Sequence, residues 1–135
     1  MVRSFIFILL LFLLRPAASY SQNWSSLGSG TNGQVLALCV YNNELIVGGS
    51  FTTVGGVSVN RIAKWNGSWS AIGTGTNNNV FSLHTSGSML YVGGEFTSAG
   101  GISANRIARW NGTSWSSMAT GMSGGDPILV LAISI

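Results

Sequence analysis

The same stretch of sequence occurs twice in this chain, 45 residues apart, and this repeat constrains the fold more than any other feature. Residues 45–52 read LIVGGSFT and residues 90–97 read LYVGGEFT. When positions 24–67 are aligned with positions 69–112, 24 of the 44 residues are identical. Self-similarity at a period of about 20 to 50 residues is typical of solenoids, propellers and related arrays. The chain is therefore expected to be built from repeated structural units.

Each unit contains four short segments that we interpret as strands, called a to d in chain order. The glycine pair in strand b indicates a close backbone approach or a bulge. Asn66-Gly67 and Asn111-Gly112 predict tight hairpins, because Asn and Gly tolerate the positive φ that such turns require. The predicted segments are strand a at 35–40 and 80–85, strand b at 45–51 and 90–96, a loop at 52–59 and 97–104, strand c at 61–65 and 106–110, and strand d starting at Trp69 and Trp115.

Four antiparallel strands in one unit predict a blade of a β-propeller, with an open β-solenoid of stacked hairpins as the alternative. The expected fold is all-β, with about two and a half blades forming an incomplete ring after a signal peptide. Both faces of a blade should be apolar, with Ile62 on one face and Ala63 on the other. The expected order is a lone strand d at 24–27, blades at 35–72 and 80–118, and the start of a further blade at 128–133.

Complete propellers have about four to eight blades, so this pattern predicts a fragment or a truncated gene product of a longer propeller. At the N-terminus, residues 1–21 have the layout of a secretory signal peptide: a positive start, an apolar run at 4–14 and small residues at 17–21. The alternative is an uncleaved anchor. Residues 22–135 are then expected to be a secreted or cell-surface partial propeller.

The charge of the expected mature part excludes some partners. From residue 22 onward there are four cations, Arg61, Lys64, Arg106 and Arg109, and three carboxylates, Glu44, Glu95 and Asp126, so the net charge is 4 − 3 = +1. A surface of this kind has no field that would attract nucleic acid or an anionic membrane. Membrane attachment is expected only through an uncleaved signal or a missing C-terminal segment.

The chemistry of an enzyme is not evident. His84 is the only histidine, no two carboxylates share a repeat position, and no Gly-x-Ser-x-Gly elbow occurs, so we expect no catalytic residues and no cofactor. Cys39 and His84 occupy the same position of strand a in successive units, but two ligands do not complete a metal site. Cys39, the only cysteine, is read as a small buried hydrophobe, with an intermolecular disulfide as the alternative.

Three N-glycosylation sequons begin at Asn23, Asn66 and Asn111, each just before a strand d. An Asn-Gly turn followed by Ser or Thr also creates a sequon by accident, so this alternative stays open for Asn66 and Asn111. Trp65 and Trp110 have fixed positions in the repeat. They are predicted to pack between blades rather than to form a sugar-binding platform.

Strand order predicts that the b–c and d–a loops lie together at one end of each blade. If the protein binds a ligand, we expect this end to bind it, because loops on a rigid scaffold commonly carry binding residues. The side chains there are neutral and suit a carbohydrate or an extracellular protein; for Asn60 and Asn105, internal capping of the loop is the alternative. The candidate ligand-binding residues are Thr31, Asn32, Thr52, Asn60, Asn77, Asn78, Thr97 and Asn105.

The repeated phrase also carries a resemblance. A strand ending in Gly-Gly with a later Trp resembles the kelch repeat. The fuller phrase, from VGGxFT through NRIA[KR]WNG, is similar to repeats of fungal cortical-marker (bud-site selection) proteins and of secreted surface proteins, over roughly residues 23–133. The resemblance implies a non-catalytic propeller in adhesion or cell-surface scaffolding. The alternatives are a fragment of a galactose-oxidase-like enzyme whose catalytic blades lie beyond Ile135, or a non-functional truncated product.

Overall fold

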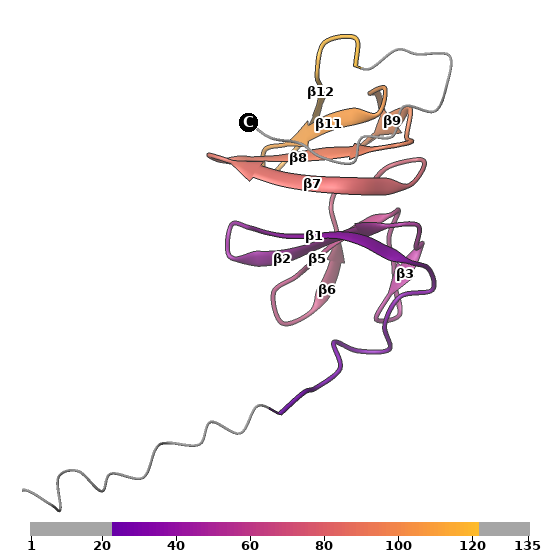
Figure 1. The fold of residues 1–135 in the computed structure, drawn as a ribbon, viewed down its shortest axis with the longest axis vertical. Helices are drawn as coiled ribbons and strands as arrows, with labels where there is room; N and C mark the ends of the chain where they lie inside the picture. The colour runs from indigo at the N-terminus through magenta and orange to yellow at the C-terminus, as the bar shows by residue number, and fades with distance from the viewer. Residues whose placement is uncertain (1–22, 122–135) are drawn as a thin grey trace, which may run out of the picture.

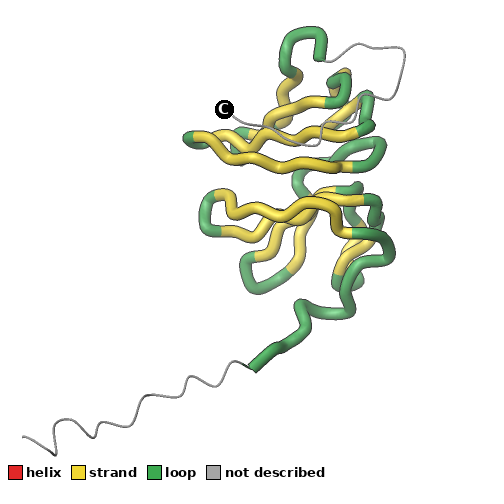
Figure 2. The backbone as a smooth tube through the Cα atoms, in the orientation of Figure 1, coloured by secondary structure: helices red, strands yellow, loops and turns green. Residues whose placement is uncertain are grey.

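The computed structural model of the chain describes residues 23–121, and this part contains strands and turns but no helix. Two four-stranded sheets lie one on the other (Figure 1), joined by loops, as the tube drawing shows (Figure 2). None of the described residues forms a helix that is long and apolar enough to cross a membrane. The predicted signal peptide at 1–21 and the predicted strand at 128–133 lie outside the described residues.

Both sheets are antiparallel and both follow the chain order a, b, c, d from one edge to the other. The first blade, in the order β1-β2-β5-β6, consists of Val35–Tyr41, Glu44–Gly49, Ile62–Trp65 and Trp69–Ala71. The second, in the order β7-β8-β11-β12, consists of Val80–Ser86, Met89–Gly94, Ile107–Trp110 and Trp115–Ser117. The described part thus holds two propeller blades that do not close a ring, which confirms the predicted fold class.

The connection between strands b and c differs from the loop that the sequence predicts. In each blade it folds into a two-stranded hairpin with two glycines at its tip. A glycine pair accepts the positive φ angles of a two-residue hairpin turn, and this explains why the segment pairs with itself. The hairpins are formed by β3 (Thr53–Val54) with β4 (Val57–Ser58), and by β9 (Ser98–Ala99) with β10 (Ile102–Ser103).

The c–d segments form hairpins, as predicted, but the backbone of their asparagines differs from the prediction. Trp65 pairs with Trp69, so the turn contains three residues, and only its glycine, Gly67, has a positive φ, of 108°. The expectation that the asparagine would share this conformation is wrong. Two consecutive left-handed asparagines occur instead in the a–b turn of the first blade, where Asn42 and Asn43 have φ values of 50° and 61°.

The glycine pair at the end of strand b permits two close approaches. A Cβ atom on Gly49 would meet the backbone oxygen of Gln34, and one on Gly48 would meet the side chain of Val80 in the next blade. Opposite the pair, strand β1 has an irregularity in its register between Val35 and Ala37, as a β-bulge produces. The predicted close approach is therefore confirmed, and a bulge accompanies it in the partner strand.

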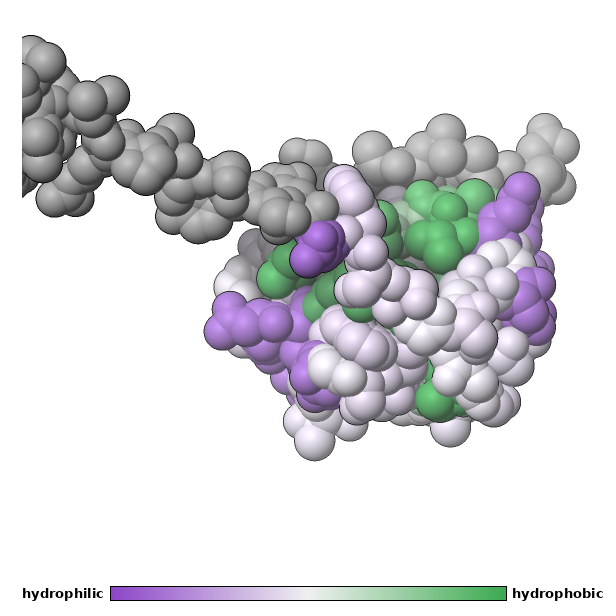
Figure 3. All heavy atoms as spheres, turned by 90° about the horizontal axis from the view of Figure 1, so that it is seen from below, coloured by the Kyte–Doolittle hydropathy of each residue, from purple (hydrophilic) through white to green (hydrophobic). Residues whose placement is uncertain are grey.

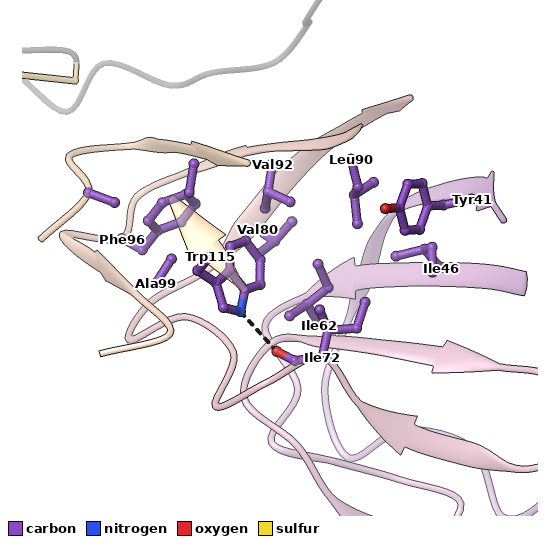
Figure 4. Close-up of a cluster of buried hydrophobic side chains, with 12 residues drawn as sticks. Tyr41, Ile46, Ile62, Ile72, Val80, Leu90, Val92, Phe96, Ala99 and Trp115 are labelled. Carbon is purple, nitrogen blue, oxygen red and sulfur yellow. Dashed lines mark hydrogen bonds between the residues drawn. The ribbon is translucent and has the colours of Figure 1, made fainter. Parts of the chain in front are cut away.

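The main hydrophobic core lies between the two blades (Figure 4). On strand β5, Ile62 belongs to this core while its neighbour Ala63 belongs to a second cluster on the opposite face, as the sequence predicts. The first blade contributes Tyr41, Ile46, Ile62 and Ile72; the second contributes Val80, Leu90, Val92, Phe96, Ala99, Ala104, Ala108 and Trp115. The second cluster consists of Val47, Phe51, Val54, Val59 and Ala63.

A tryptophan side chain ties each blade to the segment that precedes it. The Nε1 of Trp115 donates to the carbonyl oxygen of Ile72 at 3.1 Å, and the Nε1 of Trp69 donates to that of Leu27 at 2.7 Å. Leu27 is the repeat equivalent of Ile72, 45 residues earlier. The strand d predicted at 24–27 is not formed, because no strand c of the described part is available to pair with it.

The outer face of the first blade carries apolar side chains that remain exposed (Figure 3). Leu38 is 62% exposed, whereas Leu83, its repeat equivalent, packs against the core between the blades. A groove of about 410 Å³ runs along this face and is lined by Leu27, Leu38, Leu45, Val47 and Trp69, among others. The two faces of the first blade are thus both apolar, but only one is covered by a blade in the described part.

This pair of leucines tests the packing of the blades. We expect Leu83→Lys to lower the free energy of unfolding by about 1 to 3 kcal/mol, because it places an ammonium group in the apolar contact between the sheets. The matched variant Leu38→Lys should change it by less than about 0.5 kcal/mol, because that side chain is in water. Urea unfolding followed by tryptophan fluorescence measures both. Equal effects of the two substitutions would contradict the blade contact.

Candidate functional site

The connections of the two blades gather at two ends, as strand order predicts. The a–b and c–d turns lie at one end, which we call the turn end. The b–c hairpins and d–a connections lie at the other, which we call the loop end. There each d–a connection is joined to the hairpin that follows it by a single β-bridge, between Thr31 and Val54 in the first blade and between Thr76 and Ala99 in the second. The loop end is therefore tied together by backbone pairing.

An asparagine in each d–a connection holds the adjacent b–c hairpin. The Oδ1 of Asn77 accepts hydrogen bonds from the backbone nitrogens of Thr97 and Ser98 at 2.9 and 3.0 Å, and its Nδ2 donates to the Oγ1 of Thr97 at 2.9 Å. Asn32 and Thr52 make the same side-chain contacts in the first blade. These four predicted ligand-binding residues therefore use hydrogen-bonding groups to stabilise the loop end.

The other predicted residues are also used internally. The Oγ1 of Thr31 donates to the carbonyl oxygen of Gly33 at 2.7 Å. The Nδ2 atoms of Asn60 and Asn105 donate to the backbone oxygens of Thr74 and Thr120, at 2.8 and 3.3 Å. The alternative that Asn60 and Asn105 cap their loops thus describes the contacts that they make. Asn78 is exposed, and its Oδ1 accepts from the backbone nitrogen of the next residue.

A polar cavity of about 390 Å³ opens at the loop end between the two blades. It brings together the end of one b–c connection, the d–a connection and the hairpin of the second blade. Two of the predicted ligand-binding residues, Asn60 and Asn77, line it, and the other six do not. The full lining is Asn60, Arg61, Thr74, Gly75, Thr76, Asn77, Ser98 and Gly101. Its volume is within the range of about 300 to 1,000 Å³ that is usual for small-molecule sites.

Arg61 is the charged residue among the six lining residues that were not predicted as ligand-binding residues. It has a φ of 62°, an unusual conformation for a residue with a long side chain. Its backbone nitrogen donates to the oxygen of Phe51 at 3.0 Å, and its own oxygen accepts from the nitrogen of Gly49 at 2.9 Å. The repeat places Arg106 in the same conformation, with a φ of 64°. The Asn-Arg pair that recurs in both repeats could have indicated a special role for Arg61. Its position beside a cavity, however, depends on the neighbouring blade.

Two of the three glycosylation sequons lie away from this cavity. Asn66 and Asn111 are exposed in the c–d turns, at the end of the blades opposite to the loop end, and Asn23 is exposed near the start of the described part. The Nδ2 of Asn66 donates to an Oε1 of Glu44 at 3.0 Å, and the Oδ1 of Asn111 accepts from the backbone nitrogens of Thr113 and Ser114. Sugars attached at Asn66 and Asn111 would leave the cavity free.

Cys39 and His84 lie on β1 and β7, which are edge strands of the two sheets. The thiol of Cys39 packs against the core between the sheets, and burial raises its pKa from 9.0 to about 11. A folded state that keeps its proton longer than the unfolded state loses stability as the pH rises from 9 toward 11. No group of three His, Cys, Asp or Glu side chains suited to a metal ion occurs among residues 23–121.

The clamp formed by Asn77 can be tested by its removal. We expect Asn77→Ala to lower the free energy of unfolding by about 1 kcal/mol, because two backbone donors of the hairpin lose their acceptor. The neighbouring variant Asn78→Ala serves as the control and should be nearly neutral, because among residues 23–121 the Asn78 side chain hydrogen-bonds only to the adjacent backbone nitrogen. Urea denaturation provides the comparison. If Asn77→Ala were also neutral, the side chain would not hold the hairpin.

The comparisons with known proteins agree with the observed architecture. A family model described as "Domain of unknown function (DUF5122) beta-propeller" matches residues 42–71 and 87–112, and each of these stretches lies within one blade. Searches of curated proteins and of solved structures find no match. The repeats of this chain are therefore similar to a β-propeller family whose description states a fold and no activity.

Proposed function

We propose that this β-propeller chain acts outside the cell as a non-catalytic binding module for adhesion or surface scaffolding, and that its loop end binds a carbohydrate. The observation that carries this proposal is the polar cavity between the two blades. Most of its lining side chains are amides and hydroxyls, which can exchange hydrogen bonds with sugar hydroxyl groups. A protein surface is the second class of ligand that such groups suit, but a concave site of this volume favours a small ligand.

The positions of the carboxylates support a role without catalysis. Glu44 opens β2 at the turn end of the first blade, where the Nζ of Lys64 lies 3.0 Å from its Oε2. Glu95 follows β8 at the loop end of the second blade, and its Oε2 accepts from the Nδ2 of Asn79 at 3.3 Å. General acid–base catalysis requires such groups to face one substrate, and these two glutamates lie in different blades, at opposite ends. Asp126 is outside the described residues.

Two features of the sequence support the extracellular location: the N-terminal segment and the glycosylation sequons. Residues 1–21 have the composition of a secretory signal, and the sequon asparagines of the described part are exposed. The kelch-like phrase, with its similarity to repeats of fungal cortical-marker and secreted surface proteins, belongs to the same proposal. Blades of this kind are scaffolds for many functions, so the cavity, rather than the repeat, is the basis for the proposed ligand.

A glycan array probed with the full chain tests the proposal, with one variant that fills the cavity. We expect Ser98→Phe to reduce binding of any recognised glycan by about tenfold or more, because an aromatic ring would occupy the space that the ligand needs. Thr53→Phe is the matched control: Thr53 is the repeat equivalent of Ser98 and does not line the cavity. Binding to no glycan, or equal binding by both variants, would contradict the proposal.

A further inference from the structure

The cavity at the loop end contains one charged side chain that the proposed carbohydrate site does not yet explain. Arg61 is the only cation in the lining, and the lining includes no carboxylate. The ion pair found in the described part joins Lys64 and Glu44, away from the loop end. Arg61 is half-buried, and within residues 23–121 its Nε is buried without a hydrogen-bond partner. A buried donor of this kind calls for a physical explanation.

The backbone at Arg61 is strained, and its repeat equivalent Arg106 shares this conformation. A φ of 62° costs a residue with a Cβ roughly 1 to 2 kcal/mol, whereas Gly or Asn would adopt it more easily. Both hydrogen bonds of the Arg61 peptide groups would be available to either of these residues. Nothing in the backbone therefore requires an arginine here. Strain that a residue retains without a structural benefit motivates a hypothesis of function.

The geometry points to an anionic saccharide as the ligand of this cavity, with Arg61 binding its carboxylate or sulfate group. This inference rests on the proposed carbohydrate site and specifies its ligand class. A guanidinium presents several N–H donors in a planar fork that matches the oxygens of such anions. A bound anion would also supply the countercharge that the lining lacks.

The remaining lining groups suit the neutral part of such a sugar. Asn60 uses its Nδ2 to cap Thr74, and among residues 23–121 its Oδ1 has no hydrogen-bond partner. Likewise, the hydroxyl of Ser98 makes no hydrogen bond to another described residue, while its backbone nitrogen is held by Asn77. The Oδ1 of Asn60 and the hydroxyl of Ser98 can therefore bind sugar hydroxyl groups. Asn77 holds the hairpin that carries Ser98 in place.

Calorimetric titration of the full chain with three matched sugars tests this inference. The probes are methyl glucoside, which is neutral, methyl glucuronide, which carries a carboxylate, and methyl glucoside 6-sulfate. We expect at least one of the two anionic sugars to bind about tenfold to a hundredfold more tightly than the neutral sugar, as charge-assisted hydrogen bonds allow. Their order shows which anion the site takes. Arg61→Gln should remove this preference, and Arg109→Gln, which deletes an exposed arginine outside the cavity, should retain it.

The outcomes separate this inference from the proposal on which it rests. Equal binding of all three sugars, or a preference that survives Arg61→Gln, would overturn the anionic ligand and leave a neutral carbohydrate site. Binding of no sugar would overturn both. Thermal unfolding of Arg61→Asn adds a readout that is independent of binding: asparagine tolerates the left-handed conformation, so we expect an equal or higher melting temperature. A clearly lower melting temperature would assign Arg61 a structural role instead.

Discussion

A hydrogen bond from a tryptophan indole to the preceding repeat determines how the blades of this protein meet. Trp115 donates to Ile72 and Trp69 donates to Leu27, so the same contact recurs at each repeat boundary of the described part. The indole needs room to reach back. A Cβ on Gly100 would collide with the ring of Trp115, and one on Gly55 would collide with that of Trp69. Gly55 and Gly100 therefore make space for the tryptophan of their repeats, while Gly48 admits Val80 of the next blade.

The packing of the two blades also forms the cavity at the loop end. Because the indole and the buried face between the sheets set the position of one blade against the other, the loops of two successive repeats meet at the loop end. The cavity is lined by Asn60 and Arg61 from one repeat and by Ser98 and Gly101 from the next, with the d–a connection between them. Neither blade alone contains this cavity. A repeat that is structural in each copy can thus produce a binding site at the boundary between copies.

The sequence predicted those features that depend on the repeat itself. The four-strand unit, the two-sided apolar pattern of Ile62 and Ala63, and the separation of turns from loops all follow from local alternation and strand order. The turn conformations were less predictable, because asparagine tolerates both left-handed and ordinary backbone; Asn42 and Asn43 adopt the left-handed state, and Asn66 does not. Residues 24–27 match the outer strand in sequence, but pairing requires a neighbouring strand that local sequence does not supply.

The candidate site was the least predictable part, for the same physical reason. The exposed asparagines and threonines suggested a ligand surface, whereas several of them hold the loops to one another, and only Asn60 and Asn77 line the cavity. The same residue types, Asn and Thr, serve both to cap a loop and to bind a ligand, so the sequence does not distinguish the two roles. Arg61 was counted only as a surface charge, because neither its left-handed backbone nor its place beside the second blade can be read from the repeat.

Native-state amide hydrogen exchange tests the central claim, that blade packing makes the two repeats one cooperative unit. The amides of Val47 and Ala63 report on the inner strands of the first blade, and those of Val92 and Ala108 report on the second. The account predicts that all four exchange with the same opening free energy and the same dependence on urea. Exchange of one pair through a smaller opening, while the other pair stays protected, would show that the blades unfold independently and would contradict the account.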